Sequence, residues 1–187
     1  MGTLAPRTFW LPNGVRLVVR TAALDDAAEL RAISAEVVGE MRYSVSEPDE
    51  FNHSEEAERT WIARHLDRPD HLLLVGEANG HVVGHLGLDC SGRRRMRHRA
   101  LLHISVARGW RGRGVGTALI GSSLDWAAAN PQIEKVALEV LADNTAAQAL
   151  YRRFGFAEEG RRVREIKRGP GSYVDAVLMY RFVKAMG

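Results

Sequence analysis

Residues 103–118 read HISVARGWRGRGVGTA, and this stretch decides the fold that the sequence predicts. At its start, the apolar residues Leu102, Ile104 and Val106 alternate with other positions, as in a strand with one buried face. Four glycines then interrupt the pattern: Gly109, Gly112, Gly114 and Gly116. An amphipathic run from residue 115 to 129 follows and indicates a helix. The stretch therefore predicts a strand, a glycine-rich turn and a helix in direct succession.

The glycine-rich turn has the composition of an anion-binding site. Glycine permits positive φ angles and the close approach of a ligand, so that successive backbone N–H groups can converge on one point. The first turn of the helix adds unpaired N–H groups and the positive end of the helix dipole. Arg108, Arg111 and Arg113 add full positive charges. The pattern favours a phosphate or pyrophosphate site over the alternative, a tight loop that needs glycine without any ligand.

Two common phosphate-binding motifs compete for this turn. A P-loop is disfavoured because no Lys-Ser or Lys-Thr follows the glycines. A dinucleotide fingerprint needs an acidic residue about 20 residues further on, and Glu139 and Asp143 lie near that distance. Spacing alone therefore leaves the dinucleotide interpretation open.

A third pattern matches better. From Arg111 to Gly116 the turn follows R-x-x-G-x-G, which resembles the acyl-CoA pyrophosphate motif of the GNAT superfamily of N-acetyltransferases. The segment NTAAQALY, residues 144–151, followed by Gly155-Phe156, resembles the N-x-x-A-x-x-L-Y…G-F segment of the same superfamily. The two motifs stand in the same order and at a similar separation, and the resemblance covers roughly residues 15–183.

The resemblance implies a fold and a cofactor. The fold is α/β, a single GNAT-type domain over residues 1–187 with a mixed, mostly antiparallel sheet flanked by helices on both faces. Residues 1–14 would be an N-terminal strand and turn, and residues 15–183 the core. The cofactor would be acetyl-CoA. The residues expected to bind it are Ile104, Ser105, Val106, Arg111, Gly112, Arg113, Gly114, Val115, Gly116, Thr117, Asn144, Ala147 and Tyr151.

Composition excludes several other classes. A single cysteine, Cys90, rules out an intrachain disulfide framework and a metal site built from several thiolates, and we expect no metal. No basic-then-apolar leader and no apolar run of membrane-spanning length occurs, so we expect a cytoplasmic protein without a membrane partner. The net charge of +3 is too small to indicate nucleic-acid binding by itself.

The remaining elements follow from turn and cap signals. Asn13-Gly14 and Asn79-Gly80 each lie between two β-prone runs and predict hairpins. Asp25 and Ser54 are expected to cap two helices, and Asn144 a third. Residues 160–167 and 172–183 predict a closing hairpin, whose edge offers a place for a homodimer to form. The predicted order is ββαα, ββ, βα, βα, ββ.

Two charged segments have competing interpretations. Residues 39–53 form a loop rich in carboxylates, either a solvated connector or, as the resemblance implies, a wall on the acceptor side in which Glu47 and Phe51 would contact substrate. Acidic groups there would attract a cationic amine. Residues 91–99, SGRRRMRHR, suit a solvated hairpin tip better than a nucleic-acid surface, because no aromatic residue interleaves with the arginines. We therefore expect no nucleic-acid partner.

Amide formation from a thioester requires three roles. An amine with a pKa of about 10 must lose a proton before it attacks, the tetrahedral oxyanion needs a donor, and the departing thiolate benefits from an acid. The resemblance points to backbone N–H groups of residues 104–106 as the oxyanion donors, on a strand that carries a bulge in family members and splays from the next one. It assigns the acid to Tyr151, which is otherwise a core aromatic residue.

The base is left open by the sequence. His103 has the opposite side-chain parity from Leu102 and Ile104, and its ordinary pKa suits the role, but the pattern favours a hydrogen-bonded structural histidine over a base. Glu139 lies in an apolar run and could act as a desolvated base or pair with an arginine. A water relay to a loop carboxylate such as Glu47 is a third route.

The predicted function is transfer of an acetyl group from acetyl-CoA to a primary amine of a small molecule, by direct attack in a ternary complex. The C-terminal half is similar to the bacterial branch of the superfamily that acetylates small amines and amino acids. The alternatives are a protein N-terminal or lysine acetyltransferase, a non-catalytic acyl-CoA-binding module, and a nucleic-acid binder that uses residues 93–99.

Overall fold

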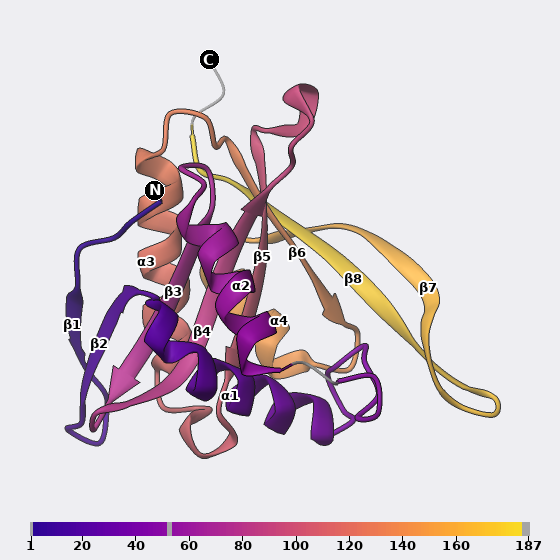
Figure 1. The fold of residues 1–187 in the computed structure, drawn as a ribbon. Helices are drawn as coiled ribbons and strands as arrows, with labels where there is room; N and C mark the ends of the chain where they lie inside the picture. Colours follow the sequence, from indigo (N-terminus) through magenta and orange to yellow (C-terminus); the bar gives the residue numbers. More distant parts are fainter. Residues whose placement is uncertain (1, 52–53, 185–187) are drawn as a thin grey trace.

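The computed structural model describes residues 2–51 and 54–184, and these form one α/β domain around a single sheet (Figure 1). The strands are β1 (Arg7–Trp10), β2 (Arg16–Thr21), β3 (Leu72–Ala78), β4 (His81–Cys90), β5 (Arg99–Val106), β6 (Lys135–Leu141), β7 (Ala157–Gly169) and β8 (Ser172–Phe182). The helices are α1 (Ala27–Gly39), α2 (Glu55–Leu66), α3 (Val115–Ala129) and α4 (Thr145–Arg153). Short 3-10 turns are η1 (Leu24–Asp26), η2 (Arg94–Met96) and η3 (Arg108–Trp110). The order of helices and strands agrees with the sequence prediction.

The sheet has eight strands in the order β1-β2-β3-β4-β5-β6-β8-β7. Every neighbouring pair is antiparallel except β5 and β6. Both Asn-Gly hairpins form as predicted, and at the second one Asn79 and Gly80 have φ angles of 54° and 79°. Positive φ at both central residues matches the twist of paired strands, which is why Asn-Gly closes this turn.

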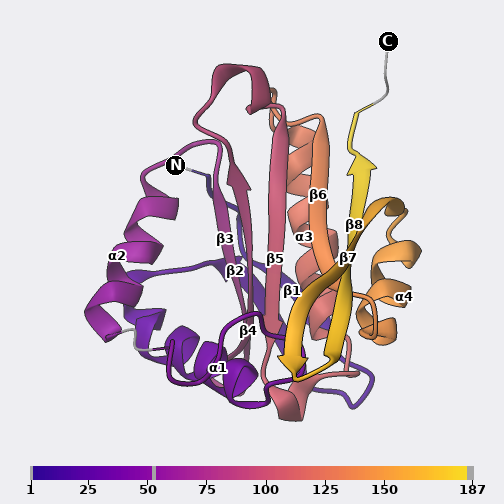
Figure 2. The same cartoon turned by 90° about the vertical axis from the view of Figure 1, so that its right-hand side faces the viewer.

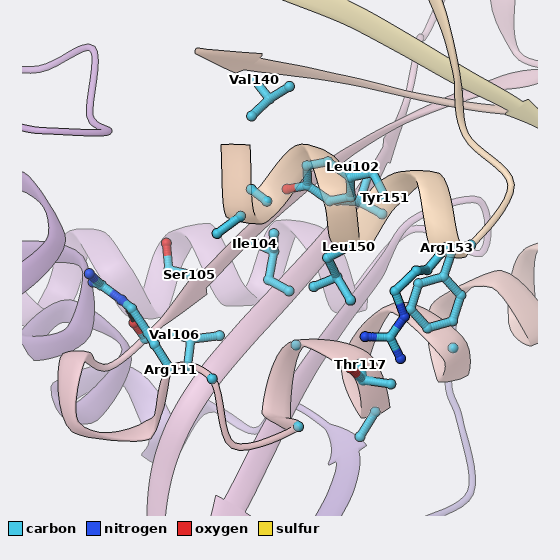
Figure 3. A pocket seen from close by; sticks show the side chains of 18 of the residues that line it. Leu102, Ile104, Ser105, Val106, Arg111, Thr117, Val140, Leu150, Tyr151 and Arg153 are labelled. Atoms are coloured by element: carbon cyan, nitrogen blue, oxygen red, sulfur yellow. Dashed lines mark hydrogen bonds between the residues drawn. The ribbon is translucent and has the colours of Figure 1, made fainter. Parts of the chain in front are cut away.

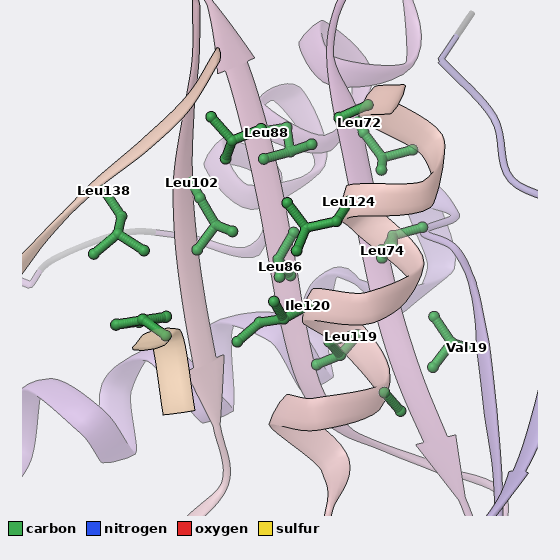
Figure 4. Close-up of a cluster of buried hydrophobic side chains, with 14 of the residues drawn as sticks. Val19, Leu72, Leu74, Leu86, Leu88, Leu102, Leu119, Ile120, Leu124 and Leu138 are labelled. Atoms are coloured by element: carbon green, nitrogen blue, oxygen red, sulfur yellow. The ribbon is translucent and has the colours of Figure 1, made fainter. Parts of the chain in front are cut away.

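Helices cover both faces of the sheet (Figure 2). Leu30 and Ile33 of α1 and Ile62 of α2 pack with Leu73 and Val75 in the smaller of two apolar cores. On the other face, α3 contributes to the larger core, which Figure 4 shows between this helix and the central strands. Its buried members include Leu74, Leu86, Leu88, Leu102, Leu119, Ile120, Leu124 and Leu138.

Two of the three predicted helix caps are confirmed. Ser54 accepts a hydrogen bond from Ala57 N at 3.1 Å, and Asn144 accepts one from Ala147 N at 3.2 Å. The prediction for Asp25 is wrong, because its side chain is 98% exposed and the chain enters α1 through η1. Asp26 is the buried residue of the pair, and Arg20 binds its two carboxylate oxygens at 2.8 Å each. Asp26 fixes the entry to α1 by an ion pair instead of a helix cap.

The edges of the sheet differ. β1, from the predicted N-terminal extension, joins the sheet as an edge strand beside β2. The boundary between residues 1–14 and 15–183 stays a prediction. β7, at the other edge, is mostly exposed and has three register shifts against β8, features that discourage pairing with another strand. The predicted homodimer stays a prediction.

No helix in the described part of the chain is long and apolar enough to cross a bilayer.

Candidate active site

The functional site starts where β5 and β6 separate. Their parallel pairing ends at the pair Leu101 and Ala137, and both strands continue beyond it. β5 from residue 102 onward therefore has no ladder partner on its β6 side. On its other side it stays paired with β4 as far as Val106, without a register shift in these described strands. The strands thus splay without a bulge between β4 and β5, and the register shift found nearby lies in β3, between Gly76 and Glu77.

A pocket of about 1160 Å³ passes through this gap from one face of the sheet to the other. Figure 3 shows Ile104, Ser105 and Val106 reaching it from β5, with Leu150 and Tyr151 from α4. On the α3 face it is bordered by Gly112, Gly114, Gly116, Thr117, Ala147 and Asn144. On the α1 face it is bordered by Val37, Glu40, Tyr43 and Val45. One continuous space thus joins the glycine-rich turn to the end of α1.

The glycine-rich turn has the backbone geometry that an anion site needs. Gly112 and Gly114 have φ angles of 71° and 96°, in a region that favours glycine, and Gly114 is the N-cap of α3. Gly114 has no side chain to occupy the helix end, so the first N–H groups of α3 face the pocket without a cap. At Gly116, an added Cβ would lie 3.3 Å from Leu150 of α4. The turn can hold a phosphate and also allows the two helices to approach closely.

The two arginines expected at this turn are engaged elsewhere. Arg111 lines the pocket, but it donates from Nε to Val106 O at 2.9 Å and from a terminal nitrogen to Glu40 Oε2 at 2.6 Å. It therefore holds the end of β5 against the end of α1. Arg113 lies with its guanidinium 5.7 Å from the ring centroid of Trp110 and is outside the pocket lining. The positive character of this turn then depends mainly on backbone N–H groups.

Tyr151 is the candidate acid and lies in the pocket wall. It is 7% exposed, and burial raises the pKa of its phenol to about 12. Its ring packs edge-on against Phe156, with centroids 5.9 Å apart. A phenol with this pKa stays protonated at neutral pH, so Tyr151 can donate a proton to a departing thiolate.

The candidate bases lie on opposite sides of the gap. Glu139 reaches the pocket from β6, and Arg162 donates to its Oε2 at 2.7 Å, which is the arginine pairing that the sequence left as an alternative. His103 borders the pocket from the α2 face of β5, with Nδ1 3.2 Å from Asp89 Oδ2. Its Nε2 is shielded from solvent and has no partner among the described residues. The structure does not bring these two groups together.

The acceptor-side residues expected from the sequence are placed differently. Glu47 and Phe51 lie outside the pocket lining, which instead includes Glu40, Tyr43 and Val45 from the end of α1 and the following loop. The β7–β8 hairpin holds this loop, because Arg168 pairs with Asp143 at 2.5 Å and donates to Arg42 O at 2.6 Å. Glu40 was visible in the sequence only as one member of a cluster of carboxylates.

Sequence reasoning also missed the N-terminal wall of the pocket. Arg7, Phe9, Trp10, Leu11 and Pro12 line it, although they precede both motifs. Arg7 pairs with Asp125 of α3 at 2.5 Å, and Trp10 is 72% exposed. No local pattern indicates this role, because it depends on β1 joining the sheet beside α3.

Comparison with known proteins agrees with this geometry. A family model described as the Acetyltransferase (GNAT) family matches residues 38–156. The L-amino acid N-acetyltransferase AaaT of Escherichia coli is 35% identical over 125 residues, which cover 67% of this chain and 76% of that protein. The N-alpha-acetyltransferase RimI of Mycobacterium tuberculosis is 36% identical over 101 residues, 54% of this chain and 61% of that protein.

The fold is also shared with solved structures. The GNAT-family acetyltransferase of Streptococcus pneumoniae superposes with a TM-score of 0.84 at 26% identity, over 90% of this chain and 99% of that one. With both motifs at the mouth of a pocket between splayed strands, the protein belongs to the Acetyltransferase (GNAT) family, the acetyl-CoA-dependent N-acetyltransferases.

Proposed function

We propose that this N-acetyltransferase transfers the acetyl group of acetyl-CoA to a primary amine of a small molecule, such as an amino acid or a polyamine. The observation that carries the proposal is that one continuous pocket joins the glycine-rich turn to the end of α1 through the gap between β5 and β6. A space open to both faces can hold two substrates at once. This supports direct attack in a ternary complex, without an acetylated enzyme.

The residues around the pocket fit acetyl-CoA. Gly112, Gly114 and the first N–H groups of α3 would bind the pyrophosphate. Bound acetyl-CoA supplies an activated thioester. The free side of β5 at residues 104–106 would then present backbone N–H groups to the developing oxyanion, and Tyr151 would protonate the thiolate.

Glu40 supports a cationic acceptor. Its Oε2 accepts from Arg111, whereas its Oε1 is buried in the pocket wall and has no partner among the described residues. An unpaired buried carboxylate oxygen is costly, and an ammonium group placed beside it would satisfy it with a charge-assisted hydrogen bond. We assign Glu40 the role of binding the acceptor amine.

Three routes for deprotonation follow from the geometry. His103 and Glu139 each border the pocket, and a water relay could end on a loop carboxylate. For that relay Glu40 replaces Glu47, because Glu40 lines the pocket and Glu47 does not. Kinetics across pH, measured with each carboxylate or imidazole replaced in turn, identifies the group that takes the proton.

The substrate class is tested with a panel of amino acids, polyamines and short peptides, using CoA thiol release as the readout. Free amines are expected to turn over, and Glu40→Gln is expected to raise their KM about tenfold while the Kd for acetyl-CoA is unchanged. Glu36→Gln is the matched control, because Glu36 lies one turn earlier on α1 and accepts from Arg108 N outside the pocket lining. Acetyl-CoA binding with no acceptor turnover would contradict the proposal.

A protein acceptor is the second candidate, and the relative named N-alpha-acetyltransferase RimI favours it. A peptide requires a groove open along its length. In this chain the loop that carries Tyr43 and Val45 is held by Arg168 of the β7–β8 hairpin. If peptides outcompete free amines in the panel, the small-molecule assignment is wrong. A cytoplasmic location is part of the same proposal.

A further inference from the structure

Asp89 lies near the end of β4 at the centre of three histidines that come from three other parts of the chain. His65 Nε2 of α2 lies 2.9 Å from Asp89 Oδ1, and His71 Nδ1, just before β3, lies 3.0 Å from the same oxygen. His103 Nδ1 of β5 lies 3.2 Å from Oδ2. Ligand atoms of His65, Asp89 and His103 all lie within 4.8 Å of one another. This His-Asp cluster is separate from the glycine-rich turn.

The hydrogen bonds of His65 decide which of its nitrogens is free. Its Nδ1 lies 3.0 Å from Trp61 O, and because a carbonyl only accepts, Nδ1 must carry the proton. In neutral imidazole Nε2 then has a lone pair, and this lone pair faces a carboxylate oxygen. His65 is 4% exposed, and its Nε2 makes no hydrogen bond among the described residues. In this neutral form an acceptor nitrogen of His65 faces a carboxylate oxygen of the partly exposed Asp89 at 2.9 Å.

His71 repeats this arrangement with its nitrogens exchanged. Its Nε2 lies 3.1 Å from Cys90 O and must donate to it, which leaves Nδ1 as the acceptor that faces Asp89 Oδ1. In their neutral forms, His65 and His71 therefore each have their single proton committed to a backbone carbonyl. Both direct a lone pair at the same carboxylate. The imidazole lone pairs and the carboxylate repel one another, and a cation bound among them would attract all of these atoms.

We propose that the His-Asp cluster binds one divalent transition-metal ion of the Zn²⁺ class through His65, Asp89 and His103, with His71 held beside them by its contact with Asp89. Imidazole nitrogens with one carboxylate oxygen are a ligand set that Zn²⁺ accepts. The backbone carbonyl of Trp61 orients the His65 ring, as outer partners of metal-binding histidines commonly do. This replaces the expectation from the sequence that the chain holds no metal.

The distances suit a tetrahedral ion. Metal–ligand bonds of about 2.0–2.1 Å place neighbouring ligand atoms about 3.3 Å apart. The nitrogen-to-oxygen distances of 2.9 Å for His65 and 3.2 Å for His103 lie within a few tenths of that value, and the ligand atoms of the three residues all lie within 4.8 Å of one another.

The backbone around the cluster is shaped to hold His103. A Cβ added to Gly87 of β4 would lie 2.2 Å from His103 Nε2, so the imidazole lies directly over this glycine. The ring centroid of Trp61 lies 5.7 Å from that of His103 and 4.5 Å from that of His65. With these three protein ligands the ion would join α2 to β4 and β5 and would keep one tetrahedral position for water. A metal on Nδ1 would also hold the His103 ring at the pocket wall.

The test uses the full chain without a histidine tag, stripped with a chelator and titrated with ZnCl2 by calorimetry. We expect one equivalent bound with micromolar or tighter Kd, and at least a roughly tenfold weaker Kd in His65→Ala and in Asp89→Asn. His81→Ala is the matched control, because His81 is an exposed histidine that pairs with Glu29 away from the cluster. Its Kd should equal that of the wild type.

A second readout covers the case in which the variants do not fold. Wild-type chain loaded with Co²⁺ should show the intense visible bands of a tetrahedral site, and added Zn²⁺ should remove them. Absence of Zn²⁺ binding and of these bands in the wild type would overturn the proposal, and the cluster would then hold protons as an imidazolium–carboxylate network. Equal binding by wild type, His65→Ala and Asp89→Asn would overturn it as well. Acetyl-CoA binding, measured separately, tests the proposed function independently.

Discussion

The two faces of β5 are built in different ways. Toward α3 and α4, Leu102 is buried in the larger core, and Ile104 packs against that core and lines the pocket. Toward α2, His103 meets Asp89 of the neighbouring strand and lies near His65. The first face follows from a motif within one stretch of sequence, whereas the second is assembled from residues up to 38 positions apart. The comparison shows that the glycine-rich turn is encoded within one stretch, whereas the opposite side of the strand is built by tertiary contacts.

The face of β5 toward α3 and α4, next to the glycine-rich turn, is called the motif face. Acetyl-CoA binding there should be the more sensitive to a single substitution. Gly114→Glu places a carboxylate at the N-cap of α3 and a side chain at a φ of 96°, so we expect acetyl-CoA binding to weaken by at least about 1000-fold. Calorimetry measures the Kd. Gly109→Ala is the matched control, because a Cβ there meets no atom within 4 Å and φ is not positive. Near-normal binding by Gly114→Glu would show that the anion binds elsewhere.

A substitution at Tyr151 tests whether the catalytic acid lies on the motif face as well. Tyr151→Phe should lower kcat about 100-fold with little change in the Kd for acetyl-CoA, since only the proton donor is lost. Because burial raises the phenol pKa to about 12, the acid stays protonated and should produce no alkaline fall in rate below about pH 10. Steady-state kinetics across pH measures both effects.

The control for that variant is Tyr180→Phe, because the Tyr180 ring of β8 packs edge-on against Phe182 and lies outside the pocket lining. If kcat falls equally in Tyr151→Phe and Tyr180→Phe, the fall comes from a disturbed fold and not from the loss of a proton donor. An alkaline limb that disappears in Tyr151→Phe would contradict the raised pKa.

On the α1 side of the sheet, a substitution at Asp26 should change the free energy of unfolding instead of the catalytic rate. Burial raises the pKa of Asp26, whereas the Arg20 guanidinium and the Ala23 N–H lower it, and the result lies below the ordinary value. A lowered carboxyl pKa contributes stability that is complete above the unfolded value near 4 and is lost as pH falls through the folded value. Asp26→Asn should cost about 2 kcal/mol at pH 7 and flatten the acid limb.

Urea unfolding between pH 3 and 7 measures this difference. Asp25→Asn is the matched control, because the neighbouring carboxylate is 98% exposed and lies 3.6 Å from Arg59 in a surface ion pair worth little. The two variants should differ most at neutral pH and converge in acid. Equal losses from both would show that the Asp26 pair contributes no more than a surface pair.

Local patterns predicted most of the fold. The alternating apolar residues of β5, the Asn-Gly turns, and the caps at Ser54 and Asn144 each act within a few residues, so the chain alone specifies them. The cap at Asp25 failed because two adjacent aspartates have the same local propensity. Only the position of Arg20, on β2 just before η1, selects Asp26.

Some features of the functional site likewise follow from the sequence, and others depend on the tertiary structure. By itself the sequence determined the order of elements, the glycine-rich turn with its helix end, and the family, because these depend on backbone geometry within one stretch. Only the tertiary structure decided that Glu40 replaces Glu47 at the pocket, that β1 forms a wall, and that three histidines converge on Asp89. These contacts join residues far apart in the chain, and no short-range spacing carries them, since they arise when strands pair and helices pack.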